Sequence, residues 1–473
     1  MPNLTSLSGA PTPVPDDQVR DLADSIAGRI LGPGNPDYDD ARTIWNAMID
    51  KRPGLIVACA RAEDAAEAVR FAARHKLLTA VQGAGHNIAG NSICDGGIVI
   101  SFQDMRAVEV DPNSGRVRVQ PGATLGDLDA ATQAHGLAVP TGINSTTGIA
   151  GLTLGGGFGW LSRKHGMTVD NLVSADVVTA NGETVRASET ENPDLFWGLR
   201  GGGGNFGVVT SFEFQAHPVG PEVLAGLIVH PFEDAGDVLR AYRDFCAQAP
   251  DEVTAWVVMR HAPPLPFLDE SVHGTRVLVL AAMYAGDMAD GEAALAPLRA
   301  IGTPHADVIG PNPFAGWQQA FDPLLTPGER NYWKTHDFTE MSDGLIDTAL
   351  SYVERIPDPQ CEVFFAQMGG AQARISEDAT AYQGRKAQFV MNVHGRWSDP
   401  SQDDTCIAWC RDLFNASAPY ATGEAYVNFM TEEEAHRVAD AYGSSYERLV
   451  ALKDKYDPTN LFRLNQNIPP SGS

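Results

Sequence analysis

The stretch Val81-Gln82-Gly83-Ala84-Gly85-His86-Asn87 decides how the rest of the chain is interpreted. Small residues after a β-branched segment predict a turn whose backbone N–H groups can approach an anion such as a diphosphate. His86, at the end of that turn, would then lie beside the remainder of the same ligand. A tight turn with a solvated histidine explains the heptad alone equally well, so the rest of the chain has to decide between the two interpretations.

The composition indicates a soluble globular protein with two domains. The chain has 473 residues, of which 43% are hydrophobic and 20% charged, and this length exceeds one ordinary core. No apolar run is long enough to span a bilayer, and the N-terminus lacks the charged and apolar pattern of a secretion signal. Residues 2–15 are small and polar and predict a loose arm. We therefore expect a cytoplasmic protein.

The net charge and the cysteines exclude several classes of function. A formal charge of −26 argues against nucleic acid and anionic membranes as partners, since both bind basic patches. A cationic substrate would suit this charge, although solubility explains it more simply. The six cysteines are too scattered for a disulfide framework, and Cys406 and Cys410, one helical turn apart, predict packing rather than a metal site. No Gly-Lys pair occurs, so there is no Walker A loop.

Turn residues divide the first half of the chain into short helices and strands. We expect helices over 63–75, from Leu125 to near Gly136, and over 193–199, where Asn192-Pro193 forms the start. Strands are expected over 79–81, 98–101, 106–110, 116–120, 174–180, 183–187 and 208–215.

A second glycine cluster runs from Thr141-Gly142 to Gly159. So many glycines weaken a helix or strand, because each loses backbone entropy on folding. The apolar residues between them, such as Leu154, Phe158 and Trp160, favour burial over a flexible loop. This combination predicts a wall against which a large flat ligand is pressed.

The segment Arg200-Gly201-Gly202-Gly203-Gly204-Asn205-Phe206-Gly207 matches the dinucleotide pattern G-x-G-x-x-G in letters only. That motif follows a strand and opens a helix, whereas this segment follows a predicted helix and opens a strand. A Rossmann domain is therefore not expected, although backbone amides here can still face a phosphate or an adenine.

Beyond His217-Pro218 the glycine clusters end, and strands alternate with amphipathic helices. We expect strands over 223–229, 253–259, 277–283, 363–367, 387–394 and 425–429, forming a second, α+β domain that supplies the substrate wall. A helix over 432–456 is followed by the clustered amides of residues 457–468, which can hydrogen-bond a heteroaromatic ligand.

Over nearly its whole length the chain resembles the bacterial berberine bridge enzyme-like family, within the vanillyl-alcohol oxidase (PCMH-type) flavoproteins. Each shared segment is weak alone, but all six in order are highly specific. They are Gly83 to Asn87, Cys94-Asp95-Gly96-Gly97, Val119-Gln120-Pro121-Gly122-Ala123, Gly148 to Gly159, Asn205-Phe206-Gly207-Val208-Val209, and Tyr456-Asp457-Pro458 to Asn467.

The resemblance implies an α+β, two-domain PCMH-type FAD-binding fold whose substrate domain is an antiparallel sheet covered by helices. The implied divisions are an arm and first helix (1–40), the FAD-binding domain (41–220), the substrate domain (221–430) and a segment returning to the FAD domain (431–473). FAD is the implied cofactor, and no metal is expected.

The resemblance also implies that His86 carries a covalent bond to the flavin 8α-methyl group. A second bond, from a cysteine, is common in relatives, but that position is Asn144 here, so we expect a single histidyl link. Three further departures are Gln82 for a common arginine, Leu152 for a histidine near the flavin pyrimidine ring, and Phe429 for the last tyrosine of a Tyr-x-Asn-Tyr segment.

The residues expected to bind the cofactor come from the shared segments. They are His86, Gln82, Gly83, Ala84, Gly85, Asn87, Asn91, Ser92, Gly122, Thr141, Gly142, Thr147, Gly148, Gly151, Leu152, Gly155, Gly156, Gly159, Asn205, Gly207, Val208, Val209, Asn465 and Asn467.

A flavin takes hydride from a substrate C–H, so a base must accept the proton of the neighbouring O–H or N–H. We expect Tyr426, Asn428 and Lys334 to be catalytic, with Tyr426 as the base on a strand facing the flavin. A tyrosine with a pKa near 10 needs a cationic or hydrogen-bonding neighbour, and Lys334 is a candidate. His336 and His394 are rival bases. The aromatic residues Tyr332, Trp333, Tyr382 and Trp397 can line a pocket or belong to the core.

The leading functional hypothesis is an FAD-dependent oxidase that acts on an alcohol, amine or sugar hydroxyl and passes electrons to dioxygen, giving hydrogen peroxide. A dehydrogenase that reacts poorly with oxygen is the second hypothesis, since the resemblance implies that Thr147 borders the oxygen approach. A flavin-binding protein without turnover is the third, supported by Phe429. A reductase that uses NADPH is less favoured, because such relatives usually lack the histidyl bond.

Overall fold

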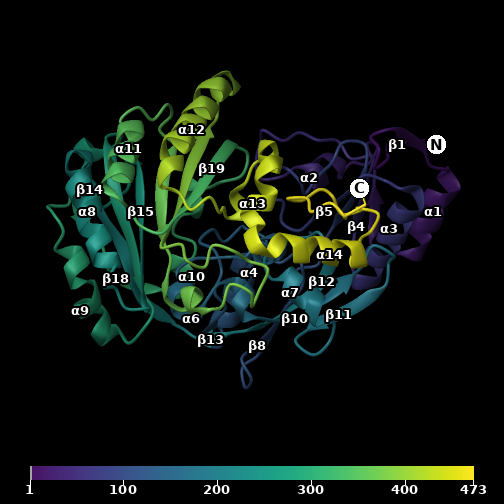
Figure 1. Cartoon of the computed structure of the whole chain (residues 1–473), viewed down its shortest axis with the longest axis horizontal. Helices are drawn as coiled ribbons and strands as arrows, with labels where there is room; N and C mark the ends of the chain where they lie inside the picture. The colour runs from purple at the N-terminus through teal and green to yellow at the C-terminus, as the bar shows by residue number, and fades with distance from the viewer. Residues whose placement is uncertain (1–2, 473) are drawn as a thin grey trace.

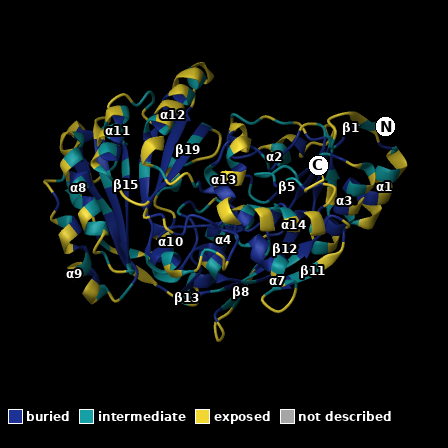
Figure 2. Ribbon diagram, viewed as in Figure 1, coloured by how far each residue is buried: buried dark blue, intermediate teal, exposed yellow. Residues whose placement is uncertain are grey.

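The computed structural model describes residues 3–472 and forms two lobes (Figure 1). The strands of the first lobe come from residues 3–218, and those of the second lobe from residues 222–397. The C-terminal segment, yellow in Figure 1, runs back from the second lobe onto the first. Strands are largely buried in both lobes, while the exposed surface lies mostly on helices and loops (Figure 2). This layout matches the expected two-domain α+β class.

The first sheet ends at the glycine turn. Its strands lie in the order β3 (Arg29–Leu31), β4 (Leu55–Ala58), β6 (Ile98–Ser101) and β5 (Thr79–Gln82), and β4, β6 and β5 are parallel. Continuous apolar strands such as Ile98–Ser101 suit a parallel sheet that is buried on both faces. Helix α3 (Ala62–His75) packs its Ala65, Val69 and Ala72 against this sheet, and helices α1 (Asp16–Ser25) and α2 (Tyr38–Arg42) flank it.

The second sheet is antiparallel and supports the glycine wall. Its order is β11 (Thr184–Ser188), β10 (Leu172–Val178), β12 (Val208–Gln215), β8 (Arg116–Val119) and β7 (Val108–Asp111). A two-stranded pair joins β9 (Leu137–Ala138) to β13 (His217–Pro218). The helical elements of this part are α4 (Leu125–Gln133), α5 (Ile149–Leu154), α6 (Ser162–His165), η1 (Thr168–Asn171) and α7 (Pro193–Leu199).

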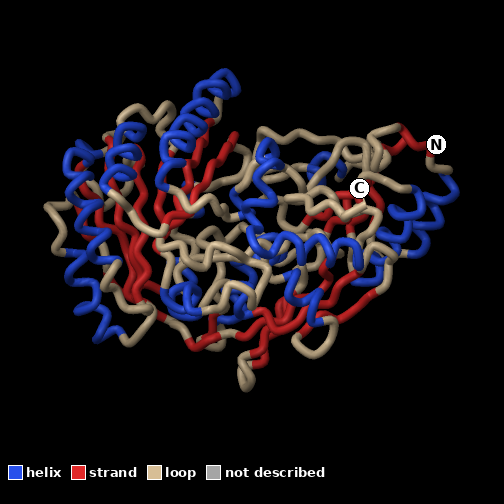
Figure 3. The backbone as a smooth tube through the Cα atoms, viewed as in Figure 1, coloured by secondary structure: helices blue, strands red, loops and turns tan. Residues whose placement is uncertain are grey.

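The second lobe is one eight-stranded antiparallel sheet with helices on a single face (Figures 1 and 3). The order is β17 (Ala306–Asp307), β14 (Glu222–Pro231), β16 (Arg276–Tyr284), β15 (Val253–His261), β20 (Glu362–Gln367), β21 (Phe389–Trp397) and β19 (Arg330–Phe338), and β18 (Gly310–Pro313) also pairs with β14. The helices that share its core are α8 (Ala235–Cys246), α9 (Met288–Arg299), α11 (Asp343–Val353) and α12 (Asp403–Ser417). Shorter turns are η2 (Phe232–Asp234), η3 (Glu270–Val272), α10 (Phe314–Trp317), η4 (Asp322–Leu324), η5 (Gly370–Arg374), η6 (Pro400–Gln402) and η7 (Ala418–Tyr420). The other face of the sheet is therefore left to meet the first lobe.

The C-terminal segment is a chain of short helices. These are η8 (Val427–Phe429), η9 (Glu432–Arg437), α13 (Val438–Tyr442), η10 (Gly443–Ser445) and α14 (Tyr446–Tyr456). At the end of α14, Lys453 Nζ lies 2.8 Å from Asp457 Oδ2, and neither side chain is exposed. The same Nζ donates to the carbonyls of Asn205 and Phe462. This buried pair fixes the returning segment to the glycine turn at 205.

Several predicted elements are wrong in their detail. The expected loose arm is a hairpin, β1 (Asn3–Thr5) with β2 (Pro11–Pro13), and Leu4 and Val14 are buried in the core. The helix expected over 432–456 is interrupted at Gly443, which adopts a φ of 46°. Within the expected strand 425–429, Val427–Phe429 form a 3₁₀ turn and the two residues before it are in no strand. Strand β19 was not anticipated, because its charged and polar residues conceal a strand that is buried although it lies at the edge of the sheet.

Of the helices described, none has the length and apolar character needed to cross a bilayer.

Candidate functional site

The heptad around His86 forms the turn that follows β5, and neighbouring backbone packs closely against it. Gly85 has a φ of +73°, and a Cβ there would lie 3.2 Å from Ile44 Cγ2. A Cβ on Gly148 would come within 2.9 Å of the Ala84 backbone nitrogen. These approaches explain why small residues occupy the turn, and they place the start of the glycine wall directly beside it.

The ring of His86 lies between an aromatic side chain and a hydroxyl group. It stacks on Trp45 with ring centroids 5.2 Å apart and planes inclined by 22°. Its Nε2 is 2.9 Å from Thr146 Oγ1. Burial lowers the pKa of His86 to about 4, so the imidazole is neutral at neutral pH.

A cavity of about 430 Å³ opens beside His86. Its lining includes Trp45, Ala84, His86, Gly122 and Thr146, so the predicted turn and the residues around it border open space. Sequence analysis predicted His86, Ala84 and Gly122 as binding residues, but it missed Trp45 and Thr146. Thr146 lies inside the second glycine cluster, which was the available signal; nothing in the sequence around Trp45 marked it.

Three of the predicted cofactor residues have unsatisfied polar atoms. Within the described part of the chain, Gln82 Nε2 and Oε1, Ser92 Oγ and Asn467 Oδ1 are buried without a hydrogen-bond partner. Leaving such groups unpaired costs about 1–3 kcal/mol each, and native proteins usually avoid it. These atoms therefore fit a polar ligand such as FAD, which carries many donors and acceptors.

Packing within the protein already requires several glycines of the wall to lack a side chain. A Cβ on Gly155 would lie 2.2 Å from Asn428 Oδ1, and one on Gly156 would lie 2.9 Å from the Tyr382 ring. Gly157, with a φ of +76°, would meet Thr168. Gly151, in contrast, has nothing within 4 Å of its Cβ position and remains open to a ligand.

The other predicted cofactor residues lie in the turns between these segments. The Asn87 side chain accepts a hydrogen bond from Asn91 N–H, and the Leu152 carbonyl accepts one from Asn428. A Cβ on Gly83, Gly122, Gly159 or Gly207 would come close to the backbone of another segment, and one on Gly142 would meet the Leu152 side chain. Thr141, Val208 and Val209 are buried at the ends of their segments, and the Thr147 carbonyl accepts from Leu125 N–H.

The turn at Asn205 and the C-terminal amides are bonded to one another. The Asn205 amide donates to the carbonyls of Gly202 and Gln466 and accepts from Ile468 N–H. The Gln466 side chain donates to the Met430 carbonyl at 3.2 Å. Asn465 lies against Gly204. The two segments predicted to hold the cofactor therefore form one unit with residues 426–430.

Tyr426 lies at the start of η8 and is buried. Its phenol oxygen accepts hydrogen bonds from Gly157 N–H at 3.1 Å and from Asn428 Nδ2 at 2.9 Å. The rings of Phe158 and Phe429 lie 4.8 Å and 4.9 Å from its own. Burial raises the pKa of Tyr426 to about 12, although the two hydrogen bonds act against this rise. Tyr426 and Asn428 thus meet the glycine wall together.

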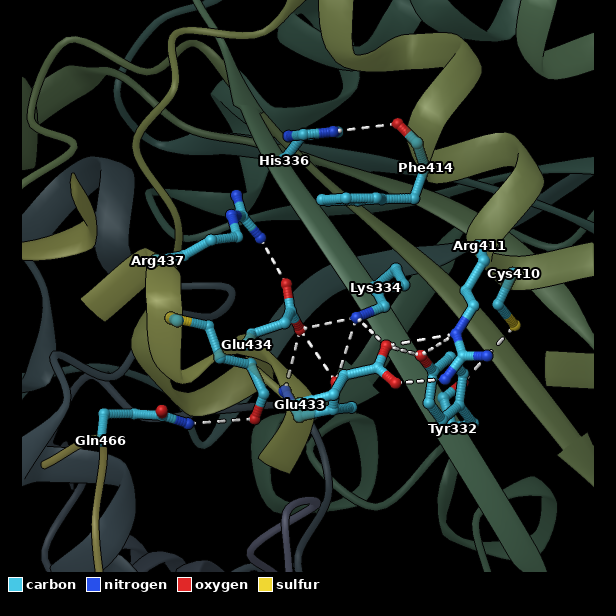
Figure 4. A network of polar contacts seen from close by, with 12 residues as sticks. Tyr332, Lys334, His336, Cys410, Arg411, Phe414, Glu433, Glu434, Arg437 and Gln466 are labelled. Carbon is cyan, nitrogen blue, oxygen red and sulfur yellow. Dashed lines mark hydrogen bonds and ion pairs between the residues drawn. The ribbon is translucent and has the colours of Figure 1, made fainter. Parts of the chain in front are cut away.

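Lys334 lies on the face of the second-lobe sheet that the helices cover, beside the ring of Phe414 on α12 (Figure 4). Its Nζ is 2.7 Å from Glu433 Oε1 and 3.1 Å from Glu434 Oε2. The polar contacts of the Tyr426 phenol within the described chain are those from Gly157 and Asn428, and none comes from Lys334. The neighbours of the Tyr426 phenol are therefore hydrogen-bond donors, and Lys334 belongs to a separate ionic cluster with Glu433 and Glu434.

The rival bases also divide between the two faces of the sheet. His336 faces the helices, where it stacks on Phe414 with ring centroids 4.1 Å apart. His394 faces the first lobe, with its Nδ1 3.4 Å from Glu362 Oε1 and its Nε2 3.0 Å from Asn331 Oδ1. Both ring nitrogens of His394 are engaged, so this histidine is built into a polar network.

A row of side chains crosses four neighbouring strands on the face toward the first lobe. The cross-strand register aligns Trp333 with His394, His394 with Glu362, and Glu362 with Arg260. Arg260 Nη1 lies 2.6 Å from Glu362 Oε2. Burial alone would raise the pKa of Glu362, but Arg260 and His394 lower it to about 2. Glu362 and Arg260 were not predicted as site residues, since they align only once the strands pair.

Of the four aromatic candidates for a pocket, Trp333 is the one that reaches toward His86. Its ring meets Trp45 at 5.9 Å, Phe429 at 5.2 Å and His394 at 5.1 Å, and its Nε1 is buried without a partner in the described chain. Tyr332 and Trp397 belong to the core beneath the helices, and Tyr382 packs on Gly156.

Comparison with known proteins places two segments in families. Residues 53–188 match the model of an FAD binding domain, and residues 425–469 match the model described as berberine and berberine like. These segments contain the His86 turn and the Tyr426 segment, respectively.

Curated relatives match along nearly the full chain. The FAD-linked oxidoreductase YvdP of Bacillus subtilis is 30% identical over 94% of this chain and 99% of its own. The (R)-6-hydroxynicotine oxidase of Paenarthrobacter nicotinovorans is 29% identical over 95% of this chain and 98% of its own. A solved structure of 6-hydroxy-D-nicotine oxidase from Arthrobacter nicotinovorans has 28% identity and a TM-score of 0.85, covering 94% of this chain and 99% of that one.

Proposed function

The chain belongs to the berberine bridge enzyme-like family of FAD-linked oxidoreductases, and on this premise we propose that it is an oxidase with FAD bound covalently through His86. It would oxidise a small organic substrate and pass the electrons to dioxygen, giving hydrogen peroxide. The observation that carries this proposal is the neutral His86 ring at the end of the glycine turn, close to a cavity and to polar atoms that lack partners.

The binding residues of the proposal are those predicted from the sequence. His86 would hold the flavin 8α-carbon, and backbone amides of residues 83–87 would face the diphosphate. The unpaired atoms of Gln82, Ser92 and Asn467 supply donors and acceptors for the remainder of the cofactor. When bound, FAD supplies the chemistry of accepting a hydride at N5.

Tyr426 and Asn428 are the proposed catalytic pair. Asn428 Nδ2 and Gly157 N–H both donate to the Tyr426 oxygen, and hydrogen bonds to the charged form of a group favour that form. Both contacts therefore favour the deprotonated phenolate, the form of Tyr426 that can accept the proton leaving the substrate O–H or N–H. We assign Lys334 an anchoring role, because its ammonium group is engaged by Glu433 and Glu434.

The substrate class follows from the face of the sheet that carries Trp333 and His394. An unpaired indole N–H beside the rings of Trp45 and Phe429 suits an alcohol, amine or sugar hydroxyl on a compact organic molecule. Related proteins are named as oxidases of 6-hydroxynicotine and of xylooligosaccharides, which supports this range. We further propose a cytoplasmic location.

Acid precipitation of the purified protein tests the proposal. Yellow flavin in the pellet, lost in His86→Ala, is the expected result; flavin in the supernatant would contradict the covalent link. An oxygen electrode then distinguishes an oxidase from a dehydrogenase. Oxygen uptake together with hydrogen peroxide production supports an oxidase. Flavin bleaching by a substrate without oxygen uptake would indicate a dehydrogenase. If no substrate bleaches the flavin, a flavin-binding protein without turnover would be favoured.

A further inference from the structure

Two residues of the turn between α4 and α5 form a chain of hydrogen bonds that ends on His86. The backbone N–H of Thr146 donates to Asn144 Oδ1 at 3.0 Å. The Thr146 hydroxyl donates to the same oxygen at 2.7 Å and lies 2.9 Å from His86 Nε2. The chain of bonds thus runs from the backbone N–H of Thr146 through the Asn144 oxygen and the Thr146 hydroxyl to the histidine ring.

The direction of each bond in this chain is determined by the first one. A backbone N–H can only donate, so the Asn144 atom that it meets must be the carbonyl oxygen and not the NH₂ group. The Thr146 hydroxyl has a single hydrogen, and that hydrogen is donated to the Asn144 oxygen. Toward His86 the hydroxyl can therefore only accept. It follows that Nε2 of His86 carries the ring hydrogen and that the lone pair is on Nδ1.

We propose that Asn144 and Thr146 are positioning residues for covalent flavin attachment, which hold His86 in the tautomer whose Nδ1 attacks the 8α-carbon. This inference rests on the proposed covalent role of His86. Among the described residues, Nδ1 of His86 has no hydrogen-bond partner, so its lone pair is not used by the protein.

The surroundings hold this arrangement in place. Ser145, between the two positioning residues, donates its N–H to Asp322 Oδ1 at 2.9 Å, and Leu125 N–H donates to the Thr147 carbonyl at 2.9 Å. On the other side of the ring, the Trp45 side chain stacks on His86, and the backbone N–H of Trp45 donates to the Gly85 carbonyl. Because the pKa of His86 is low, the ring is neutral at neutral pH and keeps the lone pair on Nδ1.

The attachment step balances with dioxygen as the oxidant. The Nδ1 lone pair forms the new bond to the 8α-carbon, and the methyl group loses one hydrogen as a proton. The two electrons left on the flavin ring pass to dioxygen, which takes up that proton and a second one from solvent to give hydrogen peroxide. The alkylated imidazole keeps its Nε2 hydrogen and becomes a cation, which the Thr146 oxygen stabilises as acceptor.

The test measures how fast FAD becomes acid-stable. Full-length protein made in riboflavin-depleted cells is mixed with FAD, and flavin in the acid precipitate is followed against total bound flavin. We expect Thr146→Val and Asn144→Ala to bind FAD but to attach it about 10-fold to about 100-fold more slowly, the range for losing the partner that orients a ligating histidine. Thr146→Ser keeps the hydroxyl and should retain the wild-type rate.

Thr348→Val on α11 is the matched control, because it makes the same substitution in the other lobe, where the hydroxyl bonds only to the Gly344 carbonyl of its own helix, and its attachment rate should be that of the wild type. Wild-type rates in both Thr146→Val and Asn144→Ala would overturn the inference alone. A wild type without acid-stable flavin would overturn the proposed covalent link itself. Where a variant loses FAD binding, two-bond ¹H–¹⁵N spectra decide: the wild type should show the Nε2–H tautomer of His86, and an unchanged tautomer in Thr146→Val would overturn the inference.

Discussion

At the scale of single residues, the environment of the Tyr426 phenol sets the pH dependence of the proposed chemistry. Burial raises its pKa to about 12, so only a small fraction is deprotonated at neutral pH. If Tyr426 is the base, the rate of flavin reduction by substrate should rise steadily from about pH 7 to about pH 10 without a plateau, because the deprotonated fraction rises tenfold per unit. Stopped-flow absorbance of the flavin measures this rate.

Tyr426→Phe should remove that rise and lower the reduction rate by about 10²–10⁴-fold, the range for a lost general base. The flavin content of the variant should not change, because the Tyr426 hydroxyl accepts from Gly157 and Asn428 and does not touch His86. A variant that keeps the wild-type rate and pH profile would exclude Tyr426 as the base.

At the scale of elements, the glycine wall packs against η8 because Gly155 has no side chain where it meets Asn428. Gly155→Ala places a methyl group 2.2 Å from Asn428 Oδ1, and we expect this crowding to lower the free energy of unfolding by about 1–3 kcal/mol. Gly151→Ala, in the helix α5 that ends just before Gly155, is the control, since nothing lies within 4 Å of its Cβ position. Thermal unfolding should show a loss for the first variant only; equal midpoints would contradict this packing.

The buried pair at the end of α14 gives a larger expected effect. Lys453→Ala leaves Asp457 buried without its cation and frees the carbonyls of Asn205 and Phe462. Breaking such a pair costs about 3–5 kcal/mol, and chemical denaturation should report that loss. Lys455 lies in the same helix as Lys453, and Lys455→Ala breaks only an exposed ion pair to Asp194 of α7. This variant should lose less than about 1 kcal/mol of unfolding free energy. Similar losses in both variants would disprove the special role of Lys453.

The elements that could be predicted from sequence are those whose local pattern and tertiary environment agree. Strands such as Ile98–Ser101 and Val208–Gln215 have the predicted bounds, since apolar periodicity and flanking turn residues both indicate them. Strand β19 was missed because Lys334 and Asp337 look solvent-exposed in sequence although both are buried, Lys334 through its pairing with Glu433 and Glu434 on a distant segment. The same applies to the site: His86 was marked by its local turn, whereas Trp45 and Glu362 reach their partners only through tertiary pairing.

At the scale of the whole molecule, the two lobes meet at a buried carboxylate. Asp129 on α4 lies across from Gln318, which follows α10 of the second lobe; the Gln318 amide is 3.2 Å from Asp129 Oδ2, Thr141 Oγ1 and the Gly142 carbonyl. Asp129 Oδ1 has no partner in the described chain. Burial raises the pKa of Asp129 to about 7, so a charged Asp129 between the lobes lowers the stability of the folded protein.

The sign of the pH effect follows from this raised pKa. Asp129 has a higher pKa in the folded than in the unfolded chain, so its contribution to stability is fully present below pH 3.8 and is lost as pH rises through about 7. Asp129→Asn removes the charge and keeps an oxygen for Gln318. We therefore expect the variant to be more stable than the wild type by about 2–4 kcal/mol at about pH 8, and the difference to vanish near about pH 4.

Asp127, two residues away on α4, provides the opposite case. Burial alone would raise its pKa, but hydrogen bonds from Thr124 and Arg106 lower it, so Asp127→Asn should destabilise the protein at neutral pH. Chemical unfolding of both variants across pH measures the two effects in one helix. A stabilisation by Asp129→Asn that does not change with pH would mean that the pKa of Asp129 is the same in the folded and the unfolded chain, and that burial between the lobes does not disfavour its charge.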